Sequence, residues 1–258
     1  MVFRHILSTD DGPIRIVTIN RPEFLNSINA EVCSELSEAI TTAAASHTLR
    51  VIIITGAGDK AFVAGGDIRF MVSATPAQAV IISQAVKMLH DTIRRCAKPI
   101  IAAVNGHCLG GGLELAMACD IRIAARTAGF GLPEIRLGIM PGGGGTARLA
   151  RLVGSAAARA LCMTGQTITA ERAYSLGLVY DVVEPAEVMS AAKRLANELA
   201  SFSEFAFGQL KSTLDKTVEC DIETAEALET KAFALCFTHS DQREGMTAFL
   251  EKRKPKFV

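Results

Sequence analysis

The N-terminal part of the chain alternates between short apolar runs and a longer segment in which apolar residues recur at helical spacing. Residues 14–19 and 51–55 are short runs rich in Ile, Val and Thr, a composition typical of β-strands. Between them, residues 30–46 carry apolar side chains three or four positions apart, and Asn29 is a suitable N-cap. The pattern therefore predicts a strand, a helix and a second strand in this order.

The same alternation continues to about residue 125 and then gives way to helices. Residues 76–95 have helical spacing and lead into residues 100–104, an unbroken apolar run typical of a strand buried on both faces. Beyond residue 125, helical spacing predominates in the following segments: 155–163, 170–176, 185–201, 205–216, 223–237 and 242–252. Strands alternating with helices, followed by a helical C-terminal part, predict an α/β architecture.

We expect one main domain with a helical C-terminal part, because no linker-like segment and no internal repeat of fixed period interrupts the chain. The C-terminal helices carry more apolar side chains than a peripheral arm needs, among them Phe233, Leu235, Phe237, Phe249 and Leu250. This surplus predicts self-association.

Charge and cysteine content narrow the range of partners and compartments. Lys plus Arg equals Asp plus Glu, at 27 each in 258 residues, which argues against a nucleic acid or an anionic membrane as the main partner. The seven cysteines are irregularly spaced without a C-x-x-C pair, so neither a zinc site nor a disulfide framework is predicted. The N-terminus has no signal-like pattern and no apolar run reaches about 18 residues. We expect a cytoplasmic protein, or a mitochondrial matrix protein whose transit peptide has been removed.

One glycine-rich segment nearly matches the dinucleotide-binding fingerprint. Gly56 and Gly58 follow an apolar strand, and Ala61 stands in the third glycine position. The fingerprint requires a helix to begin at once, whereas residues 62–66 lack a helical pattern, and no acidic residue stands near position 76 to bind a ribose. We therefore reject a Rossmann-type cofactor site here.

A second glycine cluster, residues 110–112, follows a predicted strand and opens a short helix. The N–H groups of a first helical turn are unpaired and carry the positive end of the helix dipole, so they suit an oxygen that gains negative charge. Spacing alone favours a simpler explanation, in which the glycines only permit tight packing between strand and helix. Both explanations, an oxyanion hole and a packing device, stay open from the residues alone.

Two glutamates stand in apolar surroundings close to the glycine clusters. Glu114 lies between Leu113 and Leu115, and Glu134 follows the mostly apolar residues 130–133. A desolvated carboxylate has a raised pKa and exchanges protons near neutral pH, which suits a general acid or base. The alternatives are a solvated helix surface for Glu114 and an ion pair with Arg136 for Glu134.

With these residues in place, the sequence resembles the enoyl-CoA hydratase/isomerase, or crotonase, family from about residue 20 to residue 253. Several spaced motifs carry the resemblance in the right order: Asn20-Arg21-Pro22, Leu25-Asn26-Ser27, residues 61–68, 103–120, 130–138 and 141–149, and Arg243-Glu244-Gly245-Met246. The resemblance implies a crotonase-type spiral of repeated ββα units with a helical C-terminal region that builds homotrimers or hexamers. It places the CoA-thioester-binding catalytic core in residues 1–195 and the oligomerisation region in residues 196–258.

The resemblance also assigns roles to individual residues. In that family the thioester oxygen lies between two backbone N–H groups, which match Gly66 and Gly111. Two glutamates of the hydratases match Glu114, for water activation, and Glu134, for the proton on the α-carbon. The implied substrate- and CoA-binding set is Leu25, Ser27, Ala64, Gly66, Asp67, Ile68 and Gly111. No metal and no separate cofactor is implied, because coenzyme A is part of the substrate.

The function that follows is addition of water to 2-trans-enoyl-CoA thioesters to give 3-hydroxyacyl-CoA, as in fatty-acid β-oxidation. The alternatives are a Δ3-Δ2-enoyl-CoA isomerase, which needs only Glu134, or another crotonase-type acyl-CoA reaction. An RNA-binding relative is a further alternative, against which the balanced charge counts. A His107–Cys108 nucleophile pair is disfavoured because adjacent residues in a glycine loop rarely point at one another. Leu132 and Leu113 replace Gln and Cys that are frequent in the family, which leaves the acyl chain length open.

Overall fold

The computed structural model describes residues 3–258 and contains two β-sheets. The first sheet has six strands in the order β1 (Ile6–Asp11), β2 (Ile14–Ile19), β3 (Val51–Gly56), β5 (Ile100–Val104), β7 (Ile121–Ala125) and β10 (Asp181–Val183). The second has four strands in the order β4 (Ala61–Ala64), β6 (His107–Leu109), β8 (Gly129–Gly131) and β9 (Ile168–Thr169). Only the outer pairs β1–β2 and β8–β9 are antiparallel.

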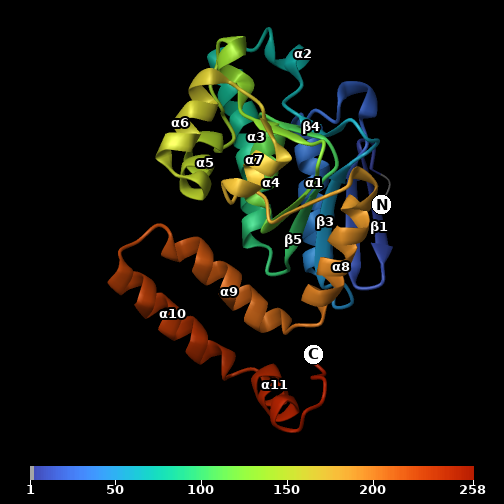
Figure 1. Ribbon diagram of the computed structural model, residues 1–258, viewed down its shortest axis with the longest axis vertical. Helices are drawn as coiled ribbons and strands as arrows, with labels where there is room; N and C mark the ends of the chain where they lie inside the picture. The colour runs from blue at the N-terminus through green and yellow to red at the C-terminus, as the bar shows by residue number, and fades with distance from the viewer. Residues whose placement is uncertain (1–2) are drawn as a thin grey trace.

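Consecutive strands of the chain enter the two sheets in turn, which produces a spiral. Strands β3, β5 and β7 lie in the first sheet, and each is followed by a strand of the second sheet, β4, β6 and β8. A helix or helical turn then returns the chain to the first sheet, as parallel pairing requires. This arrangement confirms the predicted α/β spiral of ββα units (Figure 1).

The two long helices of the core form where the apolar spacing predicts them. Helix α1 (Ala30–Ala44) begins at Asn29, whose side chain accepts a hydrogen bond from the N–H of Val32. Helix α3 (Pro76–Arg95) begins with a capping box between Thr75 and Gln78. The two helices pack against each other on one side of the first sheet.

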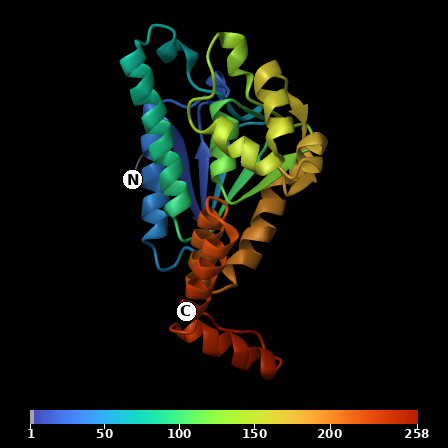
Figure 2. The ribbon, with the colours of Figure 1, turned by 90° about the vertical axis from the view of Figure 1, so that its left-hand side faces the viewer.

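The short helix α2 (Ile68–Met71) follows β4, and the remaining helices follow β6. These are α4 (Gly111–Ala118), α5 (Gly145–Val153), α6 (Ser155–Thr164), α7 (Ala170–Ser175), α8 (Val188–Ala200), α9 (Glu204–Thr217), α10 (Ile222–Cys236) and α11 (Ser240–Leu250). Helix α8 packs on the first sheet, whereas α10 and α11 project away from the core in both views (Figures 1 and 2). The predicted division at residues 195/196 stays a proposal, and α8 spans it.

The sequence patterns predict ranges for β2, β3 and β5, whereas the described structure also contains β1, β4, β6, β7, β8, β9 and β10. The last three have only two or three residues, too few to show an alternating or uniformly apolar pattern. Residues 185–201 also begin with a 3-10 turn, Pro185–Glu187, before α8. Short strands therefore interrupt the predominantly helical part predicted beyond residue 125, because pairing with existing strands stabilises these short segments.

The core lies between the first sheet and the helices that cover it. Every residue of β3 and β5 is buried, as the unbroken apolar runs predict for strands covered on both faces. Within the described residues, no helix has both the length and the apolarity needed to cross a lipid bilayer.

Candidate active site

The connection from β6 into α4 places Glu114 in the interior. Gly110 turns the chain at φ 54° and ψ −125°, a backbone conformation that a side chain at Cβ strongly disfavours. Helix α4 then starts at Gly111, and Glu114 in its first turn is only 3% exposed. The structure thus excludes the alternative of a solvated helix surface for Glu114.

The carboxylate of Glu114 is held by a glycine-rich loop, residues 142–145. Its Oε1 accepts hydrogen bonds of 2.8 Å from the N–H groups of Gly143 and Gly145. A methyl group on Gly143 would lie 2.5 Å from Glu114 Oε2, so the loop approaches this closely only because the residue is glycine. Burial raises the pKa of Glu114, and the two N–H donors and the charge of Arg148 act in the opposite direction.

Glu134 has the same functional group in a different environment. It lies in the 3-10 turn Pro133–Leu137, directly after β8, and its buried Oε2 has no hydrogen-bond partner among the described residues. The pKa of Glu134 is raised to about 7: burial raises it most, its own N–H lowers it, and the charge of Glu114 also raises it. Arg136 donates instead to the carbonyl of Thr164, and Glu134 Oε2 has no partner among the described residues, so the alternative ion pair with Glu134 is not formed in this structure.

Gly110 and Gly111 bring the predicted site residues together. A methyl group on Gly110 would lie 3.1 Å from Glu134 Oε1, and one on Gly111 would lie 3.6 Å from the nitrogen of Gly66. The backbone of Glu114 also bonds the carbonyl of Gly110 at 3.0 Å. Both glutamates and both predicted oxyanion donors therefore border one short glycine segment.

The N–H groups of Gly66 and Gly111 are free to bind a ligand oxygen. Gly66 pairs with Ile28 in a parallel bridge whose donors are Ile28 and Asp67, so its own N–H points to the other side. Gly111 is the first residue of α4, and its N–H has no acceptor within the helix. Across residues 3–258, neither group donates a hydrogen bond to the protein.

The predicted CoA-binding residues lie around these glycines with different exposures. Leu25 and Ile68 are exposed, Ala64 is half-buried, and Ser27 and Asp67 are buried. The N–H of Ala64 bonds the carbonyl of Leu25, which joins the two segments side by side. The segments therefore form a continuous surface beside Gly66.

Arg21 is a residue of this region to which the sequence assigns no role. Its guanidinium donates to Asp67 at 2.9 Å and to the carbonyl of Ser27, and Arg69 also pairs with Asp67. These contacts hold the Asp67 carboxyl pKa below its usual value, with the hydrogen bond from Arg69 as the main cause. The buried pair fixes the segment that presents the Gly66 N–H.

Two rejected alternatives are also settled by the geometry. Cys108 is fully buried, which raises the pKa of its thiol strongly, while the adjacent His107 is exposed, so they do not form a nucleophile and base. After Gly56, the chain enters strand β4 rather than a helix, which excludes the dinucleotide fingerprint.

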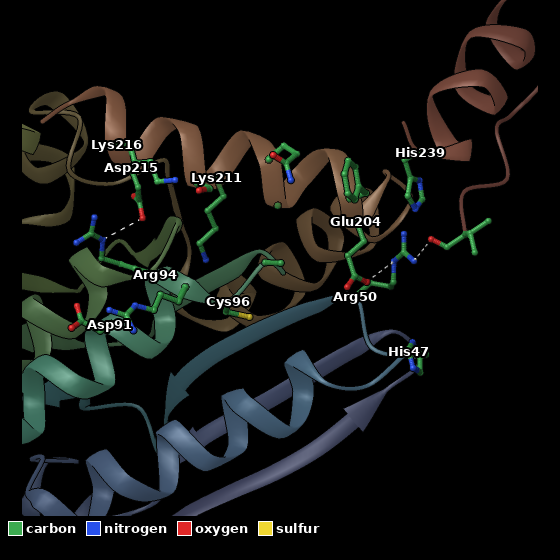
Figure 3. A pocket seen from close by; sticks show the side chains of 17 residues that line it. His47, Arg50, Asp91, Arg94, Cys96, Glu204, Lys211, Asp215, Lys216 and His239 are labelled. Atoms are coloured by element: carbon green, nitrogen blue, oxygen red, sulfur yellow. Dashed lines mark hydrogen bonds and ion pairs between the residues drawn. The ribbon is translucent and has the colours of Figure 1, made fainter. Parts of the chain in front are cut away.

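A large cavity lies elsewhere, between α9 and the core. It has a volume of about 850 Å³ and contains none of the predicted site residues. Figure 3 shows that its charged side chains are largely paired, with Arg94 near Asp215 and Arg50 near Glu204. The unpaired donors and the raised pKa values coincide instead at the glutamates and glycines, which makes this region the candidate active site.

The family resemblance implies that no metal is required. Among residues 3–258, no group of three or more His, Cys, Asp or Glu side chains is arranged to hold a metal ion. The absence of a metal requirement stays a prediction. The donors near the glutamates are backbone N–H groups, which bind anions rather than cations.

Comparison with known proteins agrees with this geometry. The sequence model of the enoyl-CoA hydratase/isomerase family matches residues 10–258. A crotonyl-CoA hydratase of Syntrophomonas wolfei is 43% identical over 258 residues, covering 100% of this chain and 99% of that protein. A short-chain-enoyl-CoA hydratase of Clostridium acetobutylicum is 43% identical, covering 98% and 97%.

Solved structures show the same fold. The enoyl-CoA hydratase of Bacillus anthracis superposes with a TM-score of 0.94 at 34% identity, covering 98% of this chain and 99% of that one. A Geobacillus kaustophilus structure gives a TM-score of 0.94 at 39% identity, covering 99% and 98%. With the family model matched over nearly its whole length, the chain belongs to the enoyl-CoA hydratase/isomerase family.

Proposed function

We propose that this protein adds water across the double bond of 2-trans-enoyl-CoA thioesters to give 3-hydroxyacyl-CoA. The observation that carries the proposal is the pair of carboxylates, the buried Glu114 and the half-buried Glu134, that border the free N–H groups of Gly66 and Gly111. Hydration needs one group to take a proton from water and another to deliver one to carbon. The names of the two relatives at 43% identity support a short acyl chain.

The proposed reaction moves one proton from water to Glu114 and one proton from Glu134 to the substrate. Glu114 takes a proton from water as the water oxygen bonds the β-carbon, and the π-electrons move onto the thioester oxygen. The N–H groups of Gly66 and Gly111 stabilise that enolate, each donor contributing roughly 3–4 kcal/mol to lowering the barrier. Glu134 then delivers its proton to the α-carbon. The pair ends with the proton on Glu114 and regains its starting state when that proton passes to Glu134.

One assay series tests this function. Purified protein is mixed with 2-enoyl-CoA thioesters of increasing chain length, and the loss of the enoyl thioester absorbance is followed. We expect hydration with the highest kcat/KM for the shortest chains. Absence of hydration at every length contradicts the proposal, and conversion of 3-enoyl-CoA to 2-enoyl-CoA without hydration establishes the isomerase alternative instead.

We propose that CoA runs along the segments of Leu25, Ser27, Ala64, Asp67 and Ile68. A cleft of about 160 Å³ lies at the outer end of this surface, lined by Pro22, Leu25, Asn26 and residues 57–61. Its position beyond Leu25 suits the nucleotide end of CoA while the thioester reaches Gly66. Protection of this cleft from hydrogen exchange by CoA tests the path.

We also propose that the protein self-associates as a homotrimer or hexamer through its C-terminal helices. Helices α10 and α11 project from the core and leave large apolar side chains exposed, including Phe249 at 82% and Leu250 at 80%. Sedimentation equilibrium should give a mass three or six times that of one chain. Phe249→Asp should shift this mass toward the monomer, and a monomeric wild-type protein contradicts the proposal.

The other partner and compartment assignments follow from the same proposal. The substrate carries coenzyme A, so no separate cofactor is needed, and neither a nucleic acid nor a membrane is proposed as a partner. All seven cysteines are free thiols in the structure, which fits a reducing compartment such as the bacterial cytoplasm or the mitochondrial matrix. Full hydration activity of the purified protein after chelator treatment and dialysis tests the cofactor assignment.

A further inference from the structure

The loop that holds Glu114, residues 142–145, is itself held from its outer side. Ser83 on α3 donates to the carbonyl of Gly142 at 2.6 Å. His90 on α3 and Arg148 on α5 both bond the carbonyl of Gly143, at 2.9 Å and 3.0 Å. The N–H of Gly143 donates to Glu114, so the same residue links the carboxylate to two side chains behind it.

His90 serves in this arrangement as a hydrogen-bond donor to the Gly143 carbonyl. It is fully buried, and burial together with the charge of Arg148 lowers its pKa to about 3, so the imidazole is neutral. His90 Nδ1 lies 2.9 Å from the Gly143 carbonyl, which can only accept, and 3.2 Å from Arg148 Nη1, which can only donate. The shorter contact favours the tautomer with the hydrogen on Nδ1, which leaves Nε2 as an acceptor. That Nε2 is buried without a partner among the described residues. An uncompensated buried acceptor is costly, which indicates that the histidine is retained for its Nδ1 donor.

Arg148 adds a charge to the same carbonyl. Its guanidinium is half-buried beneath the loop and interacts electrostatically with Glu114, Asp91 and Asp215 as favourable charges and with Arg94 as an unfavourable one. Its charge lowers the pKa of Glu114 and so favours the ionised carboxylate. Asp91 and Arg94 also line the cavity beside α9 (Figure 3).

We propose that His90 and Arg148 are positioning residues that fix the Gly143 peptide so that Glu114 Oε1 is occupied by backbone donors and Oε2 is left to take a proton from water. The proposal rests on the proposed hydration. Neither side chain contacts the substrate, because both lie on the far side of the loop from Glu114.

The arrangement has a physical consequence for catalysis. Glu114 Oε1 already accepts two hydrogen bonds, whereas Oε2 accepts none within the described chain. A carboxylate that can rotate presents either oxygen, but one fixed at Oε1 presents Oε2 in a single direction. Displacement of a catalytic group by about 1 Å can cost on the order of 100-fold in rate.

The test compares variants that remove or keep each donor. His90→Leu removes the donor at similar size, and His90→Asn retains an N–H close to the Nδ1 position. Arg148→Met and Arg148→Lys make the matching pair on α5. Arg151→Met is the control, because Arg151 is an exposed residue of the same helix that bonds only the carbonyl of Ala147.

Two reactions are measured on each variant. The first is hydration of crotonyl-CoA, which needs both glutamates. The second is exchange of the α-protons of butyryl-CoA in D₂O, which needs Glu134 and the oxyanion donors but not Glu114. We expect His90→Leu and Arg148→Met to lower kcat for hydration about 10- to 100-fold, with KM and α-proton exchange within about 2-fold of wild type. His90→Asn should recover most of the loss.

The pH profile gives a second readout. Removing the guanidinium in Arg148→Met should move the acid limb of kcat/KM to higher pH, because the ionised form of Glu114 loses a favourable charge. Arg148→Lys should keep the limb near its wild-type position. If His90→Leu does not fold, the half-buried Arg148 pair decides the question.

Three results would overturn the proposal: equal loss of hydration and exchange, unchanged hydration, or failure of both His90→Asn and Arg148→Lys to recover activity. Failure of the proposed function is distinguishable from these. In that case the wild-type protein itself does not hydrate any enoyl-CoA, whatever the variants do.

Discussion

Glu114 and Glu134 carry the same carboxylate and border the same glycine segment, but the protein treats them differently. Glu114 is held by two backbone N–H groups from the loop 142–145, with Arg148 behind it. Glu134 has a buried oxygen without a partner and a pKa raised to about 7. Hydrogen bonds and a nearby cation favour an ionised base, whereas burial without donors favours a protonated acid.

The different surroundings of Glu114 and Glu134 show how one residue type serves two roles in a single step. A base that starts ionised and an acid that starts protonated together hold one proton. Burial sets both pKa values upward, and the number of hydrogen-bond donors then separates them. The distinction resides in the surroundings of each carboxylate rather than in its chemistry.

Replacing either glutamate should have the largest effect on hydration activity. Glu114→Gln and Glu134→Gln should each lower kcat for hydration about 10²- to 10⁴-fold, because each loses a proton-transfer group. Exchange of butyryl-CoA α-protons should vanish in Glu134→Gln and persist in Glu114→Gln. Glu198→Gln, an exposed residue of α8, is the control. Persistence of exchange in Glu134→Gln would show that the roles are reversed.

The glycine that supports Glu114 should be the next most sensitive position. In Gly143→Ala, the new methyl group would lie 2.5 Å from both Glu114 Oε2 and Val86, so the carboxylate must move. We expect hydration to fall roughly 100-fold. Gly142→Ala is a matched control, because a methyl group there meets nothing within 4 Å. Equal activity of the two variants in a crotonyl-CoA assay would contradict a fixed Glu114.

The pH dependence of hydration and of α-proton exchange should further distinguish the two carboxylates. Hydration needs the pair to hold one proton, so kcat/KM should fall about 10-fold per pH unit above the pKa of about 7 of Glu134. Water addition releases no net proton, so dehydration of 3-hydroxybutyryl-CoA must show the same profile. Exchange of butyryl-CoA α-protons needs ionised Glu134 and should instead rise through this pH. A rising hydration rate above pH 7 would contradict the assignment.

The same pKa makes a prediction about stability. The folded pKa of Glu134 lies above the ordinary glutamate value of 4.5, so between 4.5 and about 7 the native state binds a proton that the unfolded state has lost. Stability from this group therefore decreases as pH rises through that window. Thermal unfolding of Glu134→Gln should show a larger gain over wild type at pH 8 than at pH 4, and an equal gain at both contradicts the raised pKa.

The smallest effect is expected at the first oxyanion donor. In Gly66→Ala, the new methyl group would lie 3.2 Å from the flexible Met71 sulfur, and the backbone N–H is retained. We expect hydration within about 3-fold of wild type, because the donor belongs to the backbone. A loss comparable with that of Gly143→Ala would show that Gly66 is required for space rather than for its N–H.

Much of the fold is determined by local sequence. The unbroken apolar runs of β3 and β5, the spacing of α1 and α3, and the caps at Asn29 and Thr75 all specify their own structure. The motifs that flank them carry the family and, with it, the spiral order of strands. By contrast, β8, β9 and β10 exist only because neighbouring strands supply their hydrogen bonds.

The candidate site, like the fold, could be predicted from the sequence only in part. Glu114, Glu134, Gly66 and Gly111 can be chosen from the sequence, because the motifs that carry them are local. That Glu114 is the carboxylate held by a loop follows only from folding, because the two donors come from Gly143 and Gly145, about thirty residues from Glu114 in sequence. His90 gave no signal within an ordinary helix, since its role depends on a carbonyl that folding brings to it.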